Sequence, residues 1–211
     1  MPQDQIVRQS DWSSLMSNLG FSENTDTYTD LKRRYNENHR KYHNVAHIES
    51  VLIEFGKTRY IAENNSSVEL ALWFHDAIYN TFSKSNEKES ADLAVSFISS
   101  NSGTLELQQI VYSLIMATEH NFVPKLNDQR LIVDIDLSIL GTAESRYEEF
   151  ETAIRKEYKY VPWFIFKRKR IELLQYFLDR ESIYSQEYYI DSLEKQARVN
   201  IKNAIAKLKS T

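Results

Sequence analysis

Glycine and proline are scarce in this chain. Its 211 residues include only 4 glycines and 3 prolines. Folds made of many short strands need frequent tight turns, and those turns favour glycine and proline. The scarcity therefore favours helices joined by few connections, and we expect an all-α fold.

The spacing of apolar residues is helical along most of the sequence. The clearest seam repeats with the helical period and consists of His47, Ile48, Val51, Leu52 and Phe55. Similar spacing predicts helices over about residues 66–79, 86–99, 104–118, 128–140, 142–158, 162–178 and 186–208. We expect a single compact domain over residues 1–211, with its core at about 39–141 and the helices of about 142–211 packed on it.

Two local signals mark expected helix boundaries. Ser66 is followed three residues later by Glu69, the pattern of a capping box at the start of a helix. Gly141 follows an apolar helical segment, where a glycine commonly ends a helix in the left-handed conformation. We therefore expect one helix to begin near Ser66 and another to stop at Gly141.

Composition limits the partners and the chemistry. The formal net charge is −4, from 26 basic and 30 acidic side chains, which does not indicate a nucleic-acid surface. There is no cysteine, so any metal ligands are imidazoles or carboxylates. The first twelve residues lack a leader-like apolar run, and the apolar segment 70–79 is too short to span a bilayer. We expect a cytoplasmic protein that binds neither nucleic acid nor membrane.

Ionisable side chains interrupt three of the apolar segments. His75 and Asp76 lie in VELALWFHDAIY, where nearly every neighbour is apolar, and His47 lies on the seam described above. Burying an ionised carboxylate without a partner is costly, so such groups are normally paired or bound to metal. A hydrogen-bonded structural His–Asp pair and a metal site are both open interpretations.

The third interruption is the pair of aspartates in LIVDIDLSIL. At three and four positions on either side, Asp136 has only apolar neighbours, whereas Asp134 also faces Arg130 and Ser138. We therefore expect Asp136 to be the more deeply buried carboxylate and Asp134 to be a surface partner of Arg130. Asp136 then has the greater need of a cation.

Together these segments predict a metal centre with mixed nitrogen and oxygen ligands. Two imidazoles and two carboxylates suit a divalent ion such as Mn, Mg, Fe, Co, Ni or Zn, among which the sequence does not choose. Such an ion activates water near neutral pH and polarises a phosphoryl oxygen, which is the physical case for hydrolysis. The predicted ligands are His47, His75, Asp76 and Asp136.

The order of these residues resembles the HD superfamily of metal-dependent phosphohydrolases, in particular its small bacterial members. The segments that carry the resemblance are HRKYHNVAHI, ALWFHDAIYN, NEKESA, ATEH, DIDLSILG, IRKEY and EKQARVNI, between residues 39 and 201. The resemblance implies a helical fold with the same four ligands, and it implies that the second aspartate of DID is the ligand. Asn80 departs from the pattern, since an aspartate is expected after HDAIY, and Lys167-Arg168 replaces an expected glycine-arginine pair.

Further polar residues near these motifs have both functional and structural interpretations. Glu87 is either a proton donor or acceptor, with Asp76 and His120 as the other catalytic candidates, or it complements a helix dipole. His120 could equally end a helix favourably. Arg40, His43 and Asn44 are candidates for binding substrate, and His43 or Asn44 could instead orient His47.

Two charged patterns in the C-terminal third have plain structural explanations. The basic stretch at residues 155–170 is interleaved with aromatic residues, and we interpret it as a solvated helix face. Glu194 and Arg198 have the spacing of an ordinary helical ion pair.

The leading functional hypothesis is hydrolysis of a nucleotide or another small phosphate ester, with a metal-bound water as nucleophile. The alternatives are a non-catalytic sensor of nucleotide or metal and a di-iron oxygenase. The expected partner is a small phosphorylated substrate, and self-association into a homodimer is left open.

Overall fold

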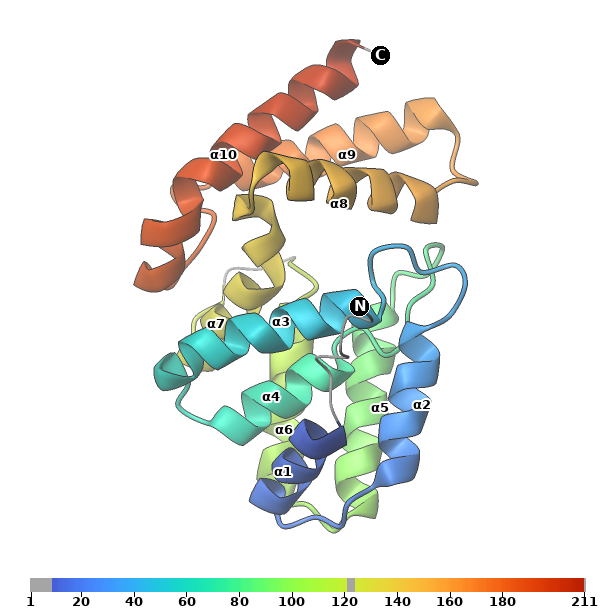
Figure 1. Ribbon diagram of the computed structural model, residues 1–211, viewed down its shortest axis with the longest axis vertical. Helices are drawn as coiled ribbons and strands as arrows, with labels where there is room; N and C mark the ends of the chain where they lie inside the picture. Colours follow the sequence, from blue (N-terminus) through green and yellow to red (C-terminus); the bar gives the residue numbers. More distant parts are fainter. Residues whose placement is uncertain (1–8, 121–123, 211) are drawn as a thin grey trace, which may run out of the picture. The chain divides into compact units, whose positions relative to one another are not determined.

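A computed structural model describes residues 9–120 and 124–210 of the chain. The expectation that the first twelve residues lack a leader falls largely on residues 1–8, which lie outside the described residues. Over the described ranges the regular structure is entirely helical, without strands, which confirms the all-α prediction (Figure 1). The helices are α1 (Gln9–Leu19), α2 (Thr25–Tyr35), α3 (Val45–Thr58), η1 (Arg59–Ile61), α4 (Asn65–Phe74), α5 (Asn86–Ser100), α6 (Leu105–Ala117), α7 (Asn127–Asp136), η2 (Leu137–Gly141), α8 (Glu144–Glu157), α9 (Trp163–Leu178) and α10 (Glu187–Ser210), where η denotes a 3-10 helix.

The chain divides into two compact units between Val133 and Asp134. Unit 1 ends with most of α7, and unit 2 contains η2 and α8 to α10. The division falls inside α7, which is one continuous helix from Asn127 to Asp136. The expectation of a single domain stays a prediction.

In the described ranges no helix has the length and apolar character needed to cross a membrane.

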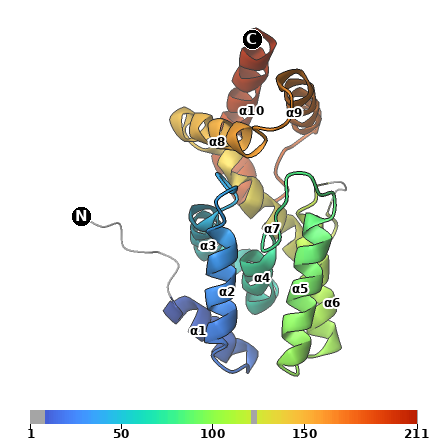
Figure 2. The same cartoon turned by 90° about the vertical axis from the view of Figure 1, so that its right-hand side faces the viewer.

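Helix α4 forms the centre of unit 1. All residues from Val68 to Phe74 are buried, because α4 packs against α1, α3, α5 and α6. Figure 2 shows α4 between α3 and the α5–α6 pair. A helix surrounded in this way is apolar on every side rather than along one stripe, which explains the continuous run VELALWF.

Aromatic contacts tie the first two helices to α4. The Trp12 ring meets the Trp73 ring edge-on, with 5.3 Å between centroids, and its Nε1–H donates to the carbonyl of Glu23 at 2.9 Å. The Tyr35 hydroxyl donates to the carbonyl of Trp73 at 3.0 Å. Both large side chains therefore find a polar partner while their rings remain in the core.

The predicted start of α4 near Ser66 is confirmed, since the helix begins at Asn65, but its predicted capping box and its predicted end are wrong. The N-cap is Asn64, whose side chain accepts a hydrogen bond from the Ser67 N–H, so Ser66 and Glu69 do not form a capping box. Glu69 instead pairs with Arg59 at 2.6 Å. The helix ends at Phe74 rather than near Tyr79, and its C-terminal cap is His75.

In unit 2, helix α10 packs against η2, α8 and α9. Gly141 is required at the contact with α10, because a Cβ there would lie 2.5 Å from Cβ and 2.8 Å from the carbonyl oxygen of Leu193. The expected left-handed conformation at Gly141 is wrong, since the only glycine with positive φ in the described chain is Gly20. Gly141 therefore permits close packing rather than a special backbone angle.

The predicted ion pair in α10 is confirmed and has a wider role than expected. Arg198 Nε donates to Glu194 at 2.7 Å, and its NH2 group also donates to the carbonyls of Arg180 and Glu181. Glu194 in turn accepts the N–H groups of Ile183 and Tyr184. The pair fixes the connection between α9 and α10.

Candidate metal centre

Two helix ends bring the imidazoles of His47 and His75 together. His47 lies in the first turn of α3, which begins after Asn44, and His75 follows the last residue of α4. Both side chains are buried, at 2% and 1% exposure. Their Nε2 atoms are 3.1 Å apart.

Asp76 completes a compact group of donor atoms with these imidazoles. Its Oδ2 lies 3.3 Å from His47 Nε2 and 3.2 Å from His75 Nε2. At metal–ligand lengths of about 2.0–2.2 Å, neighbouring ligands around one ion are about 2.8–3.6 Å apart. All three separations fall in this range, so the donor atoms fit a single divalent ion.

A backbone contact fixes the orientation of His75. Its Nδ1 lies 2.7 Å from the carbonyl oxygen of Leu72, to which it donates as Nδ1–H in the neutral ring. The tautomer is inferred from this partner. Nε2 then carries the lone pair, which either accepts a hydrogen bond from His47 or binds a cation. A second hydrogen bond of this kind is the usual support of a metal-binding histidine.

The electrostatics of this group favour an ionised Asp76. Burial alone would raise the pKa of Asp76, but His75 and His43 in their protonated, positively charged form, together with hydrogen bonds from His47 and from protonated His75, hold it well below its usual range. The carboxylate is therefore charged at neutral pH. A charged carboxylate beside two imidazole nitrogens is a suitable partner for a divalent cation.

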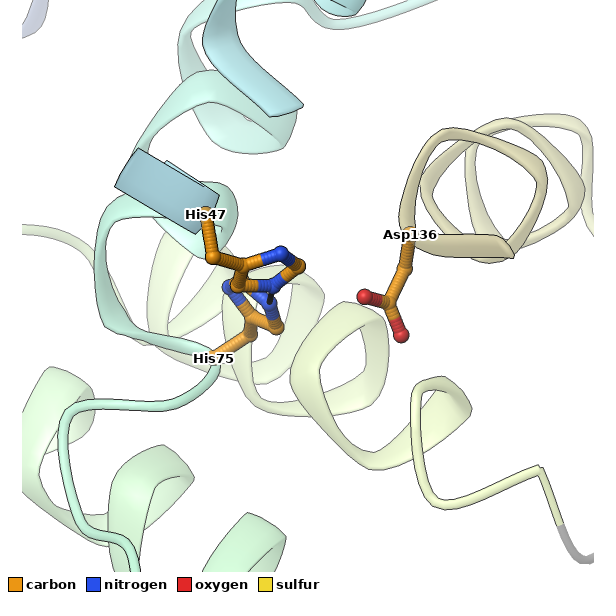
Figure 3. Close-up of side chains that lie close together, drawn as sticks. All are labelled: His47, His75 and Asp136. Carbon is orange, nitrogen blue, oxygen red and sulfur yellow. Dashed lines mark hydrogen bonds between the residues drawn. The ribbon is translucent and has the colours of Figure 1, made fainter. Parts of the chain in front are cut away.

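Asp136 is the fourth predicted ligand and the last residue of α7. His47, His75 and Asp136 each offer a donor atom, and these atoms lie within 4.8 Å of one another (Figure 3). The three residues could therefore hold a metal ion. Asp136 lies three residues beyond the division between the units, at the end of the helix that begins at Asn127.

The predicted burial of the two aspartates is reversed. Asp134 is fully buried and Asp136 is half-buried. Asp134 accepts the N–H groups of Ser185 and Gln186, at 2.6–3.0 Å, and does not pair with Arg130. Arg130 donates instead to the carbonyl of Pro124. Asp134 thus holds the start of α10, a partner that its helical neighbours do not reveal.

Arg40 was predicted to bind a substrate phosphate, but in the structure its guanidinium binds groups of the protein itself. Its buried guanidinium donates to the carbonyls of Asp76 at 2.6 Å, Ala77 at 3.0 Å and His43 at 3.2 Å, and its Nε donates to Glu37. These contacts use four of the five N–H donors that an arginine has. Arg40 therefore joins the backbone after His75 to the segment before α3.

The contacts of Arg40 and of two other side chains also explain why α4 ends at Phe74 rather than near Tyr79. The carbonyls of Asp76 and Ala77 are taken by Arg40, and Ser90 Oγ binds both backbone polar groups of Ile78. His39 Nε2 lies 2.9 Å from the carbonyl of Tyr79. Side chains from elsewhere thus replace the helical hydrogen bonds over residues 76–79.

Asn44 and His43 precede His47 in different roles. Asn44 is the N-cap of α3, accepting from the Ala46 N–H at 2.9 Å, so it fixes the helix that carries His47. The ring of His43 stacks on Tyr79 with centroids 4.3 Å apart and meets His47 edge-on at 5.8 Å. Sequence reasoning did not single out Tyr79 or Ser90, because neither stands out until the chain folds.

Glu87 interacts electrostatically with both Asp76 and His120. Glu87 lies in the first turn of α5, and burial raises its pKa, with smaller contributions from Asp76 and Glu119. His120 follows α6 and adopts a φ of 58°, an unusual conformation for a residue with a side chain. Its charge acts on Glu87 in the opposite direction. Both residues are therefore placed where they influence one another.

Asn80 organises the loop that follows the histidine–aspartate pair. Its N–H donates to Asn86 Oδ1 at 2.9 Å, and its carbonyl accepts from Asn86 Nδ2 at 3.0 Å. Its own Oδ1 accepts the N–H of Phe82. Asn80 stands where the resemblance to the HD superfamily predicts an aspartate, and here its side chain supports the loop before α5.

Comparison with known proteins adds no relative. No model of a protein family matches the chain, and neither a curated protein nor a solved structure does so. Function is therefore inferred from the residues and their geometry.

Proposed function

We propose that this chain is a metal-dependent phosphohydrolase of the HD superfamily, acting on a nucleotide or another small phosphate ester. The observation that carries the proposal is the group of donor atoms on His47, His75 and Asp76, which are 3.1–3.3 Å apart, with Asp136 beside the histidines. The proposed ligands are these four residues. The order of the motifs supports the family.

A divalent ion bound there would supply Lewis acidity and an activated water. The protein's part is to hold the donor atoms in place without movement of the chain. Asp76 provides negative charge at neutral pH, because its pKa lies well below its usual range. Leu72 fixes the ring of His75, and Asn44 fixes the turn that presents His47.

Proton transfer is assigned to Glu87, with His120 as its neighbour. A carboxyl group with a raised pKa holds a proton closer to neutral pH, which suits a general acid or base. Burial is the main cause of the increase at Glu87, and the negative charge of Asp76 adds to it. His120, whose charge lowers the pKa of Glu87, is the second candidate for proton transfer.

Substrate binding is assigned mainly to the segment before α3. Because Arg40 uses most of its donors on backbone carbonyls, we assign it chiefly to positioning the residues after His75. The side chain of His39 is half-exposed, and His43 lies beside His47. These imidazoles could donate hydrogen bonds to phosphate oxygens.

The experiment is a phosphate-release assay with the full chain. Nucleotides and simple phosphate esters are supplied with Mn²⁺, Mg²⁺, Co²⁺ or Ni²⁺. The proposal predicts metal-dependent release of phosphate that His75→Ala/Asp76→Ala abolishes. His120→Phe tests proton transfer, and Lys84→Ala, a change in an exposed residue outside the ligand group, is the control.

Three outcomes would contradict the proposal in different ways. Full turnover by His75→Ala/Asp76→Ala would exclude the metal centre as the source of activity. Tight nucleotide binding without product under any metal would favour a sensor. Bound iron with a visible absorption band and oxygen consumption would favour an oxygenase.

A further inference from the structure

The turn between α8 and α9 exposes three large aromatic side chains within five residues. Tyr160 is 74% exposed, Phe164 72% and Trp163 40%. We call residues 156–169 the α8–α9 tip. Phe164 has no polar atom that gains from contact with water, so its exposure at this turn calls for an explanation.

The tip is also strongly basic. Among the described residues, Lys156, Lys159 and Lys167 have no carboxylate within ion-pair distance, although the chain as a whole is acidic. Arg168 and Lys169 share the single carboxylate of Glu172, at 3.8 and 2.8 Å. The N-terminus of α9 adds its partial positive charge at Trp163.

Acidic charge within the tip is confined to one buried side chain. Glu157 is the only acidic residue in residues 156–169, and it is 5% exposed. The surface presented by the tip therefore combines apolar rings with uncompensated positive charge.

The backbone of the tip is held in place by Arg155. Its guanidinium donates to the carbonyls of Tyr158 at 2.7 Å and Val161 at 3.1 Å, and it lies 5.5 Å from the centre of the Trp163 ring. The Lys159 ammonium lies 4.7 Å from the centre of the Tyr160 ring. The rings and charges are therefore presented together on a braced turn.

We propose that the α8–α9 tip docks on the surface of an anionic lipid bilayer. Aromatic rings bury their apolar parts at the level of the lipid headgroups, while lysine and arginine remain with the anionic phosphates. Tyr160, Trp163 and Phe164 supply the rings, and the five cations beside them supply the charge. This inference replaces the expectation of no membrane partner, which rested on overall charge and apolar segments.

Charge argues against two other occupants. A second copy of the chain placed on the same tip would bring like charges together. A nucleic-acid strand would need a basic track beyond the tip, but in the adjoining hollow of about 430 Å³ the basic side chains of Arg155, Lys156 and Lys207 are matched by those of Glu144, Glu148 and Glu151. A bilayer needs contact with the tip alone.

Trp163 makes the proposal directly measurable. Of the three tryptophans, all within the described residues, Trp12 and Trp73 are 0% and 1% exposed, so Trp163 alone is accessible to lipid. The full chain is mixed at low salt with vesicles of phosphatidylcholine alone or with an equal part of phosphatidylserine. We expect sedimentation with the anionic vesicles only, a blue shift of tryptophan emission, and quenching by brominated acyl chains.

Variants separate the tip from the rest of the surface. Phe164→Ser should weaken binding by roughly tenfold, from the apolar area it no longer buries. Lys159→Gln/Lys167→Gln should weaken it by roughly 25-fold, about fivefold for each charge. Tyr60→Ala is the matched control, because Tyr60 is 76% exposed and lies far from the tip in sequence, and it should leave binding unchanged.

Three results would overturn the inference. One is failure of the folded protein to sediment with anionic vesicles at low salt. Another is binding that the Phe164 and lysine substitutions leave intact. The third is tip-dependent binding of a single-stranded oligonucleotide more tightly than of vesicles, which would make nucleic acid the partner.

Discussion

Replacement of Arg40 by lysine tests how the backbone after His75 is held. The substitution keeps the positive charge and removes the planar fork of the guanidinium. Arg40 now donates to the carbonyls of Asp76, Ala77 and His43. A lysine ammonium cannot reach all three in the geometry of the fork, so at least two of these contacts should be lost.

The expected cost follows from the number of contacts and their burial. Each hydrogen bond to a charged donor contributes about 1.5–3 kcal/mol, so the loss of two predicts a decrease of about 3 kcal/mol in the free energy of unfolding. The same change should loosen His75 and Asp76. Disturbed support of metal ligands typically weakens metal binding by about 10–100-fold.

Two measurements on one protein background separate these effects. In a Trp163→Phe background, the remaining tryptophans, Trp12 and Trp73, report urea unfolding of unit 1. Titration calorimetry with Mn²⁺ reports metal affinity. Arg170→Lys is the matched control, because Arg170 is also buried but pairs with Glu151 in unit 2, and it should leave Mn²⁺ affinity unchanged.

A free energy of unfolding of Arg40→Lys within about 0.5 kcal/mol of its parent, the range of an ordinary surface change, would refute the stabilising role of the carbonyl contacts. A destabilised variant that bound Mn²⁺ with unchanged affinity would refute only the positioning role. The carbonyl contacts would then support the fold without tuning the site.

Further predictions concern Asp134, Gly141 and Glu87. Burial raises the pKa of Asp134 to about 7, so the stability that its protonated form provides is complete below its ordinary value of 3.8 and is lost as pH rises through 7. Unfolding of Asp134→Asn should lack this loss, and its stability relative to wild type should increase by up to about 4 kcal/mol between pH 4 and 8; parallel pH profiles would contradict this. Gly141→Ala should destabilise unit 2 by about 1–3 kcal/mol in urea, since its Cβ would meet the backbone of Leu193, and an unchanged midpoint would contradict the close contact. Glu87→Gln should slow phosphate release by about 10²–10⁴-fold with metal binding retained, whereas unchanged turnover would leave Glu87 a role at the helix terminus only.

The helical content was predictable because it depends on local pattern. Few glycines and prolines, together with apolar spacing of helical period, indicated the fold class without knowledge of distant contacts. The continuous apolar run in α4 is consistent with its central position in unit 1. The end of α4 was not predictable, because Arg40, Ser90 and His39 supply its replacement hydrogen bonds from other parts of the chain.

In the candidate site, too, features that depend on neighbouring residues were predictable and features that depend on distant contacts were not. His47, His75 and Asp76 stood out because ionisable groups in apolar segments need partners, and they do lie together. The prediction that Asp136 is more deeply buried than Asp134 was wrong, because Asp134 binds the backbone of Ser185 and Gln186, some fifty residues later in the chain. The residues three and four positions from Asp134 in the helix give no information about a contact with a segment so far along the chain.

Metal binding by Asp136→Asn and Asp134→Asn tests the central claim most directly. The two aspartates are two residues apart on α7, and only Asp136 belongs to the group with His47 and His75. After loading with Mn²⁺ and removal of free metal, elemental analysis should find about one equivalent or more in wild type and in Asp134→Asn, and a clear loss in Asp136→Asn and His47→Ala. No bound metal in folded wild type under any loading, or equal binding by all four proteins, would contradict the account and leave the cluster as a structural hydrogen-bond network.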